Sequence, residues 1–175
     1  MNILATITEE DFGRASTKEK WSSYPVRTAA RAILLNELSE IALMHVSKYH
    51  YFKLPGGGVD EGESIQEALN RELAEEVGTQ DIEIIAEIGE VDEYRDQWDA
   101  KTEHYGFVAK VVGLLVDPTR TEKEIEHGYE TVWAKDIDEA IQLVQSGTPA
   151  EYGQNFEKMR ELAFLEHVKR SKLVK

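Results

Sequence analysis

Three glutamates near the middle of the chain have the side-chain type and the spacing to bind a divalent cation together. Glu72, Glu75 and Glu76 stand at positions i, i+3 and i+4, which on a helix places their Cβ atoms about 5 to 6 Å apart on one surface. Carboxylate oxygens suit Mg²⁺ or Mn²⁺, ions that complete their coordination shell with water and substrate phosphate. Like charges at this spacing destabilise a bare helix. The pattern therefore indicates either a metal site or a solvated acidic face.

The residues around these glutamates favour the metal site. Three consecutive glycines, residues 56–58, precede the acidic segment, and glycine is costly unless the backbone must take unusual angles or let a ligand approach closely. An apolar stripe at every fourth position predicts a helix from about Ser64 until Gly78 stops it; its members are Ile65, Leu69, Leu73 and Val77. The glutamates lie beside this stripe rather than opposite it, which weakens the interpretation as a solvated face.

The segments that must position this helix predict a mixed α/β domain. Strands are expected over residues 27–35, 41–46 and 51–54, which lead into the glycine loop, and then over 82–88 and 107–116. Two further helices are expected over residues 136–144, capped by Asp136, and over about 153–168. Without regular βαβ spacing the class is α/β with a mixed sheet. We predict one domain over 1–175, in which 1–25 form an N-terminal extension or edge strand and 152–170 a C-terminal helix.

Composition and charge limit the possible partners. The 175 residues carry a formal charge of −14, which repels nucleic-acid backbones and argues against a nucleic-acid duplex as partner. The chain has no cysteine, which removes disulfides, thiolate zinc sites and cysteine nucleophiles from consideration. Neither a signal peptide nor a membrane span of roughly 20 apolar residues is apparent. We therefore expect a cytoplasmic location, and a homodimer is compatible with the sequence.

The acidic segment resembles a known family motif. Gly57, five residues, Glu63, seven residues and then the run from Arg71 to Gly78 resemble the Nudix box, and Thr79 is the one departure because an aliphatic residue is usual there. The resemblance implies a Nudix-like α/β/α sandwich with a mixed sheet. It also implies an enzyme that hydrolyses a nucleoside diphosphate linked to another moiety and uses Mg²⁺ or Mn²⁺.

The resemblance also implies roles for individual residues. Glu72, Glu75 and Glu76 become metal ligands, and the backbone carbonyl of Gly56 completes the site. Arg71 pairs with one of these carboxylates and holds it in place, since its planar fork suits bidentate contact. The remaining box positions are an orienting carboxylate at Glu63 and substrate contacts at Gly57 and Gly58.

One carboxylate outside the box is a candidate general base. The family often supplies it from a loop before the last strand, and an acidic run precedes Trp133 at the corresponding place: Glu122, Glu124 and Glu126. We favour Glu126. The alternative is that all of these side chains are solvated loop acids.

The substrate is less well defined by the sequence. Tyr94 falls sixteen residues after Gly78, and a tyrosine at about that distance resembles the pattern of diadenosine polyphosphate hydrolases. Several side chains could contact phosphates, namely Arg27, Arg31, Lys53 and Arg95, and others could stack on a base, namely Trp21, Tyr24, Tyr51, Phe52, Trp98 and Tyr105. Of these Arg31 and Tyr94 are our substrate-site candidates. The expected substrate is a nucleoside triphosphate, oxidised forms included, or a dinucleoside polyphosphate; the alternative is a catalytically silent Nudix-fold nucleotide sensor or protein-binding module.

Overall fold

The computed structural model describes residues 1–174 and shows a mixed seven-stranded sheet. The strands are β1 (Ile3–Ile7), β2 (Val26–Leu35), β3 (Ile41–Val46), β4 (Tyr51–Lys53), β5 (Asp81–Arg95), β6 (Ala100–Val112) and β7 (Tyr129–Ala134). Their order is β1-β5-β6-β2-β3-β4, with β7 paired to β3. The pairs β1–β5 and β2–β6 are parallel and the other pairs are antiparallel. The predicted mixed α/β class is therefore confirmed, and β1 is an edge strand.

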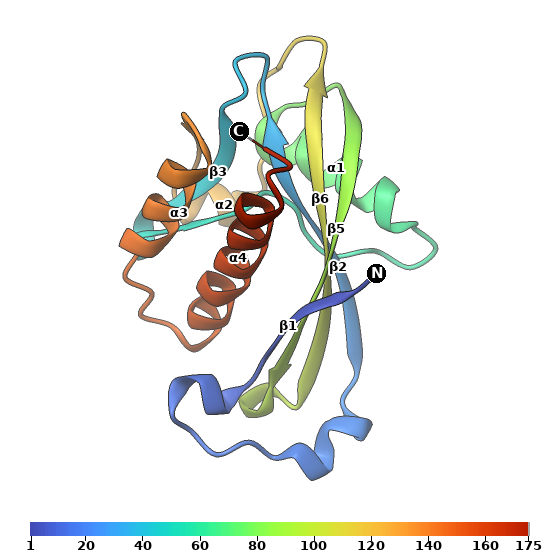
Figure 1. Cartoon of the computed structure of the whole chain (residues 1–175), viewed down its shortest axis with the longest axis vertical. Coiled ribbons are helices and arrows are strands. Elements are labelled where there is room, and N and C mark those ends of the chain that lie inside the picture. Colours follow the sequence, from blue (N-terminus) through green and yellow to red (C-terminus); the bar gives the residue numbers. More distant parts are fainter. Residues whose placement is uncertain (175) are drawn as a thin grey trace.

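Helices cover both faces of the sheet. They are α1 (Ile65–Val77), α2 (Glu122–Glu126), α3 (Ile137–Ser146) and α4 (Tyr152–Ser171). Figure 1 shows α1 on one side of the sheet and α3 and α4 on the other. None of the helices in residues 1–174 is long and apolar enough to cross a membrane.

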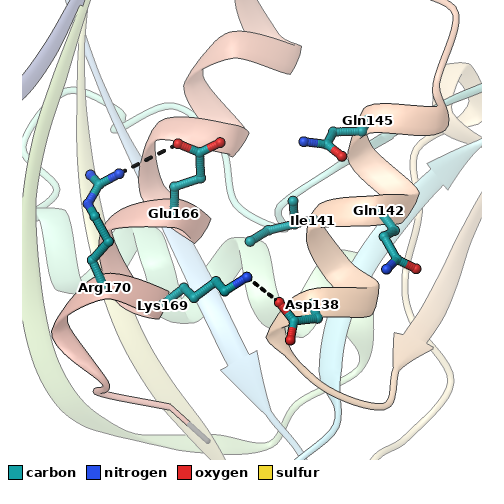
Figure 2. Close-up of a pocket in the computed structure, with 7 residues that line it drawn as sticks. All are labelled: Asp138, Ile141, Gln142, Gln145, Glu166, Lys169 and Arg170. Atoms are coloured by element: carbon teal, nitrogen blue, oxygen red, sulfur yellow. Dashed lines mark ion pairs between the residues drawn. The ribbon is translucent and has the colours of Figure 1, made fainter.

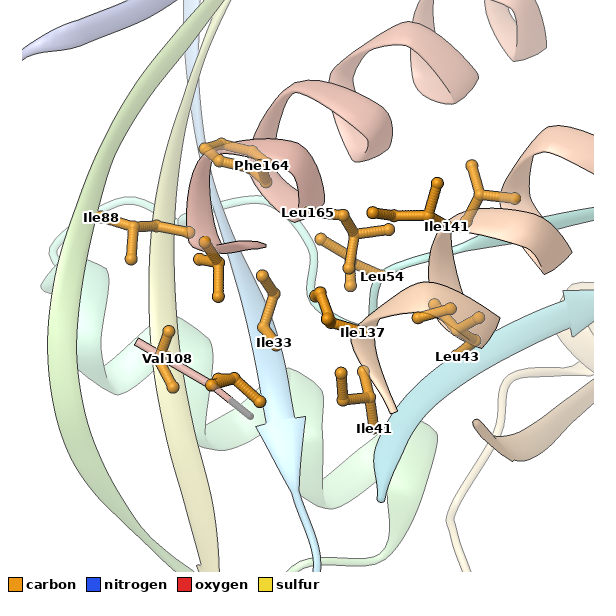
Figure 3. Packing of buried hydrophobic residues seen from close by; sticks show 14 of the residues in the cluster. Ile33, Ile41, Leu43, Leu54, Ile88, Val108, Ile137, Ile141, Phe164 and Leu165 are labelled. Carbon is orange, nitrogen blue, oxygen red and sulfur yellow. The ribbon is translucent and has the colours of Figure 1, made fainter. Parts of the chain in front are cut away.

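The alternation of side chains along β2 separates two hydrophobic cores. Ile33 and Leu35 belong to the larger core, which α3 and α4 cover, and Figure 3 shows Ile33 packed near Phe164 and Leu165 of α4. Ala32 and Leu34 point to the opposite face and pack with the apolar stripe of α1 because successive strand side chains alternate between faces. A central strand that is apolar on both faces is thus explained by helices on both sides.

The predicted helix boundaries of α1 are confirmed by its capping residues. Ser64 accepts a hydrogen bond from the backbone of Glu67, whose side chain accepts one from the backbone of Ser64, and this capping box starts the helix. Gly78 ends it with a left-handed backbone at φ 83°. A Cβ at Gly78 would also overlap the carbonyl of Val116, so a larger residue would be both strained and crowded there.

Several segments differ from the sequence-based prediction, among them the strand expected over residues 82–88, which extends to Arg95 in β5. The strand expected over residues 107–116 is instead β6, Ala100–Val112, because β6 pairs with β2 along the whole of that strand and with β5 on its other side. Gly113, with φ 79°, ends the strand, and Leu114 beyond it is exposed. The acidic run expected in a loop forms the short helix α2, which Thr121 caps.

Strands β2 and β3 diverge along most of their length. They pair at Leu35 and Ile41, and from there the two strands separate, as Figure 1 shows. The segment that enters α1 runs beside β2 in the space between them: Ala30 donates its N–H to Gly57, Ala32 donates to Pro55, and Ala29 bridges to Gly58. The glycine loop is therefore held on the sheet itself, where the sheet opens.

Candidate active site

Two positions of the glycine loop leave no room for a Cβ beside their present neighbours. Gly56 has φ 128°, and a Cβ there would overlap the carbonyl of Ala30. A Cβ on Gly57 would overlap the carboxylate of Glu72. The box glycine thus allows a helix carboxylate to lie directly against the loop backbone.

Arg71 ties the loop to the helix through a network of charge-assisted hydrogen bonds. Its Nε and Nη2 donate to the two carboxylate oxygens of Glu63 at 2.9 Å each, its Nη1 donates to Glu72 at 2.8 Å, and Nη2 also donates to the carbonyl of Gly58 at 2.9 Å. The bonds from Arg71 lower the pKa of Glu63 to about 2, and the bonds to Glu63 and Glu72 raise the pKa of Arg71. A bidentate fork of this kind fixes geometry as well as charge.

Glu76 is the most buried of the helix carboxylates. It is 2% exposed, and its Oε2 accepts a 2.7 Å hydrogen bond from the N–H of Gly56 while Oε1 lies 3.2 Å from Lys53 Nζ. Burial, the largest single influence, lowers the pKa of Lys53, but the charge of Glu76 together with smaller contributions from Tyr129 and Glu157 raises the pKa above its ordinary value. Lys53 Nζ also lies over the ring of Tyr129, 4.7 Å from its centre.

The helix glutamates therefore do not simply repel one another, as their spacing alone had suggested. Glu72 pairs with Arg71 and Glu76 with Lys53. Glu75 is different, because its side chain is 42% exposed and its carboxylate is 3.7 Å from Arg71. The site thus combines two closely held carboxylates with one that is partly exposed and more loosely paired.

These residues have the chemistry that Mg²⁺ or Mn²⁺ requires. Glu72, Glu75 and Glu76 offer hard oxygen donors from one helix, next to a loop in which Gly56 and Gly57 bring the backbone against Glu72 and Glu76. A second acidic group, formed by Glu90, Asp92 and Glu103, has carboxylate oxygens within 4.8 Å of one another on β5 and β6. Lys101 Nζ is 2.9 Å from Asp92 and 2.8 Å from Glu103, so this second group already has a cation of its own.

The remaining predicted site residues lie in different surroundings. Arg31 is near the helix carboxylates: it donates to the carbonyl of Ala30, against which Gly56 packs, and its charge interacts with Glu76. Tyr94 stacks on Trp21 with ring centres 4.0 Å apart. Glu126 lies on α2 with its side chain 70% exposed and pairs with Lys48 at 2.8 Å. Arg31 is therefore linked to the glycine loop through the Ala30 carbonyl, whereas Tyr94 and Glu126 have other partners.

Sequence reasoning missed a buried ionic network on the α4 side of the sheet. Arg160 is 1% exposed and donates to Glu93 at 2.8 Å and to Glu161 at 2.5 Å, and it also contacts Nε2 of His104 at 3.3 Å. Nearby Arg31 has a lowered pKa, caused first by burial and then by the charge of Arg160. The low hydrophobic periodicity of α4 is a sequence signal for this network, since polar residues occupy positions that face the core.

A surface hollow elsewhere does not have the character of a reaction site. Figure 2 shows it between α3 and α4, where Lys169 pairs with Asp138 at 2.5 Å and Arg170 with Glu166 at 3.6 Å. Both ion pairs are exposed, and each of these charged side chains already has a partner of opposite charge. The reactive groups of the molecule thus gather at the glycine loop and α1.

A family model described as NUDIX domain matches residues 25–146, which include the glycine loop and α1. Among curated relatives, an RNA pyrophosphohydrolase of a Nitratiruptor species is 38% identical over 95 residues, which cover 49% of this chain and 61% of the relative. An RNA pyrophosphohydrolase of Campylobacter jejuni is 56% identical over 39 residues, 22% of this chain and 25% of the relative. The chain thus spans less than two thirds of the length of either relative.

Solved structures share the fold. The MutT protein from Methanosarcina mazei Go1 has a TM-score of 0.58 at 22% identity, covering 85% of this chain and 96% of that protein. A NUDIX hydrolase from Nitrosomonas europaea has a TM-score of 0.55 at 20% identity, covering 78% and 89%. The predicted sandwich architecture is therefore confirmed.

Proposed function

The chain belongs to the Nudix family, and from this premise we propose that it is a metal-dependent pyrophosphohydrolase. The observation that supports the proposal best is the Arg71 network, which holds Glu63, Glu72 and the carbonyl of Gly58 together at 2.8 to 2.9 Å. A silent nucleotide sensor or binding module has no need for this constellation of paired and buried carboxylates. The complete set therefore favours an enzyme over the alternative.

The box residues take separate roles in this proposal. Glu72, Glu75 and Glu76, with the carbonyl of Gly56, would hold Mg²⁺ or Mn²⁺. When bound, such an ion neutralises phosphate charge and lowers the pKa of a coordinated water. Arg71 and Glu63 are positioning residues because they contact Glu72 and the loop.

The basic residues beside the carboxylates provide the phosphate contacts in this proposal. Lys53 pairs with Glu76, and the charge of Arg31 interacts with Glu76, whereas the protein as a whole carries a charge of −14. A carboxylate and a phosphate charge at ~4 Å repel by about 4 kcal/mol at an effective dielectric constant near 20. Local cations and the metal are thus needed to hold a polyphosphate at this surface. Gly57 and Gly58 let its oxygens approach the backbone.

The general base is proposed to be Glu126. It lies on α2, just before β7, and its charge is balanced by Lys48. Because its side chain is largely exposed, this base reaches a water molecule only if substrate binding draws it toward Glu76. Tyr94, at the end of β5, is proposed to contact the substrate.

We propose a nucleoside triphosphate or a dinucleoside polyphosphate as the substrate. The names of the relatives raise a second candidate, an RNA that carries a pyrophosphate linkage. The net charge of −14 favours the free nucleotide because a longer RNA would bring more phosphates into a repulsive field.

A substrate panel with product identification tests this function. Nucleoside triphosphates, dinucleoside polyphosphates and a 5′-triphosphorylated RNA are incubated with Mg²⁺ or Mn²⁺, with excess EDTA as the control. We expect a nucleoside monophosphate and the remaining phosphate-bearing fragment, and no turnover in EDTA. Release of only terminal orthophosphate, or undiminished turnover in EDTA, would contradict the proposed reaction. Faster turnover of the RNA than of the free nucleotides would assign the second substrate.

A further inference from the structure

An aromatic cavity adjoins the candidate active site. Its volume is about 560 Å³, enough for one nucleoside. Rings surround it from β4, β7, α4 and two short 3₁₀ helices, Ser47–Tyr49 and Asp96–Trp98. These rings are Tyr49, Tyr51, Trp98, Tyr129 and Tyr152. Flat rings of this kind can stack on a base of any identity.

Tyr129 connects the wall of the cavity with the proposed phosphate site. Tyr129 lines the cavity, and Lys53 Nζ lies 4.7 Å from the centre of the Tyr129 ring and 3.2 Å from Glu76. A base in the cavity would therefore place its phosphates beside Lys53 and the helix carboxylates. The cavity, Lys53 and the helix carboxylates therefore follow one another in the order in which the base, the phosphates and a phosphate-bound metal would lie along a nucleotide.

Two polar side chains of α4 line the cavity side by side. Gln154 and Glu157 stand at i and i+3 and share one face of the helix. Both hydrogen bonds of the Gln154 side chain use Oε1, which accepts from the N–H groups of Ala150 and Glu151. This fixes the orientation of the amide and leaves the Nε2 hydrogens for another partner.

Glu157 offers the complementary group. Its Oε2 is buried and has no hydrogen-bond partner within residues 1–174. The charge of Glu157 favours the cationic forms of Arg31 and Arg160 and contributes to the raised pKa of Tyr51, which burial causes first. A buried carboxylate oxygen without a donor is costly, so a ligand that supplies N–H groups would satisfy it.

We propose that this cavity binds the base of the substrate and that Gln154 and Glu157 select guanine over adenine. The inference rests on the proposed function, whose nucleotide substrate it specifies. One edge of guanine carries an acceptor, O6, followed by two donors, N1–H and the N2 amino group. Gln154 supplies the donor for O6 and the Glu157 carboxylate accepts from N1–H and N2–H. Adenine presents an amino group and an unprotonated N1, which face Gln154 and Glu157 with the wrong polarity.

Binding of nucleoside monophosphates, measured by calorimetry without metal, tests this inference apart from catalysis. We expect GMP to bind about tenfold or more tightly than AMP, with IMP between them because it lacks the N2 amino group. Glu157→Gln should weaken GMP binding about tenfold or more and leave AMP binding unchanged. Glu166→Gln, an exposed change on the same helix, is the matched control and should have no effect on either ligand.

A second measurement locates the ligand and keeps the test independent of folding. GMP should quench tryptophan fluorescence in the parent, and Trp98→Phe should remove most of that quenching because Trp98 lines the cavity. Equal binding of GMP and AMP, or a GMP preference that survives Glu157→Gln in a variant with parental circular dichroism, overturns the inference. Hydrolysis without base preference would overturn the inference and leave the proposed function intact. A GMP preference without any hydrolysis would support the inference and overturn the proposed function.

Discussion

The carboxylate of Glu76 accepts a 2.7 Å hydrogen bond from the backbone N–H of Gly56, twenty residues earlier in the chain. This bond joins the last turn of α1 to the glycine loop, and Lys53 pairs with the other oxygen of the same carboxylate. One side chain thus connects the loop, the helix and the nearest phosphate-site cation. Its burial at 2% exposure makes it both a structural and a proposed catalytic group.

Glu76→Gln should abolish most turnover and also lower stability. Loss of a direct metal ligand costs several kcal/mol of transition-state stabilisation, on the order of a thousandfold in rate. Gln can still accept from Gly56, but Lys53, 12% exposed, loses its countercharge. The metal-free protein should be less stable by about 1 to 3 kcal/mol.

Turnover rates with Mn²⁺ and urea unfolding in EDTA measure the two effects. Glu75→Gln is the stability control, because substitution of the partly exposed Glu75 should change the free energy of unfolding by under about 0.5 kcal/mol. Normal turnover in Glu76→Gln would remove this residue from the metal site.

Gly57→Ala should impair turnover because its Cβ would overlap the Glu72 carboxylate. Displacing this carboxylate breaks its contact with Arg71 and moves a proposed metal ligand, so we expect a loss of about tenfold or more in rate. Gly58→Ala, in the same loop, is the comparison: its Cβ meets the far end of the exposed Arg27 side chain, which can move away, so its loss of rate should be smaller. Steady-state rates of both variants at saturating Mn²⁺ make the comparison. Equal rates for the two variants would show that the position of Glu72 does not limit catalysis.

Glu126→Gln tests the proposed general base. A positioned base contributes about a hundredfold or more to the rate, so we expect a loss of that size. The melting temperature should stay within about 2 °C of the parent, because the Lys48–Glu126 pair is exposed and surface pairs contribute little. Glu122→Gln on the same short helix is the control for a general change in charge. A parental rate in Glu126→Gln would assign these residues to the solvated surface and place the base elsewhere.

Stability should fall on mild acidification because of His104. Burial lowers the pKa of His104 to about 3, and the charge of Arg160 adds to the effect, whereas a histidine in the unfolded chain titrates near ~6.5. Between these values the unfolded state binds a proton that the folded state does not, so this contribution is present above pH ~6.5 and is lost as the pH falls. At pH 5 the loss amounts to about 2 kcal/mol.

Urea unfolding at pH 8 and pH 5 measures this loss of stability. His104→Gln should reduce the difference in stability between the two pH values, whereas His50→Asn, at an exposed histidine, should not. An equal pH dependence in both variants would contradict the assignment.

Local sequence determined the helix that carries the chemistry. The Ser64–Glu67 capping box, the stripe ending at Val77 and the left-handed Gly78 involve residues that are near neighbours in the chain. Such signals need no knowledge of the rest of the fold. The spacing of Glu63, Arg71 and Glu72 likewise identified the family before any contact was known. The strand β3, at Ile41–Val46, was also predicted correctly because its apolar run is bounded by a polar turn.

Tertiary structure decided which of these acidic residues are buried and what each one contacts. The neighbours Glu75 and Glu76 have the same side chain, yet one is exposed and the other is held by Gly56 and Lys53. The difference arises because the divergence of β2 and β3 brings the glycine loop over one side of α1. Similarly, Glu157 and Arg160 resemble surface residues of an ordinary helix until α4 packs on the sheet. Residues that are far apart in sequence meet only when the strands pair, and sequence periodicity does not encode those distances.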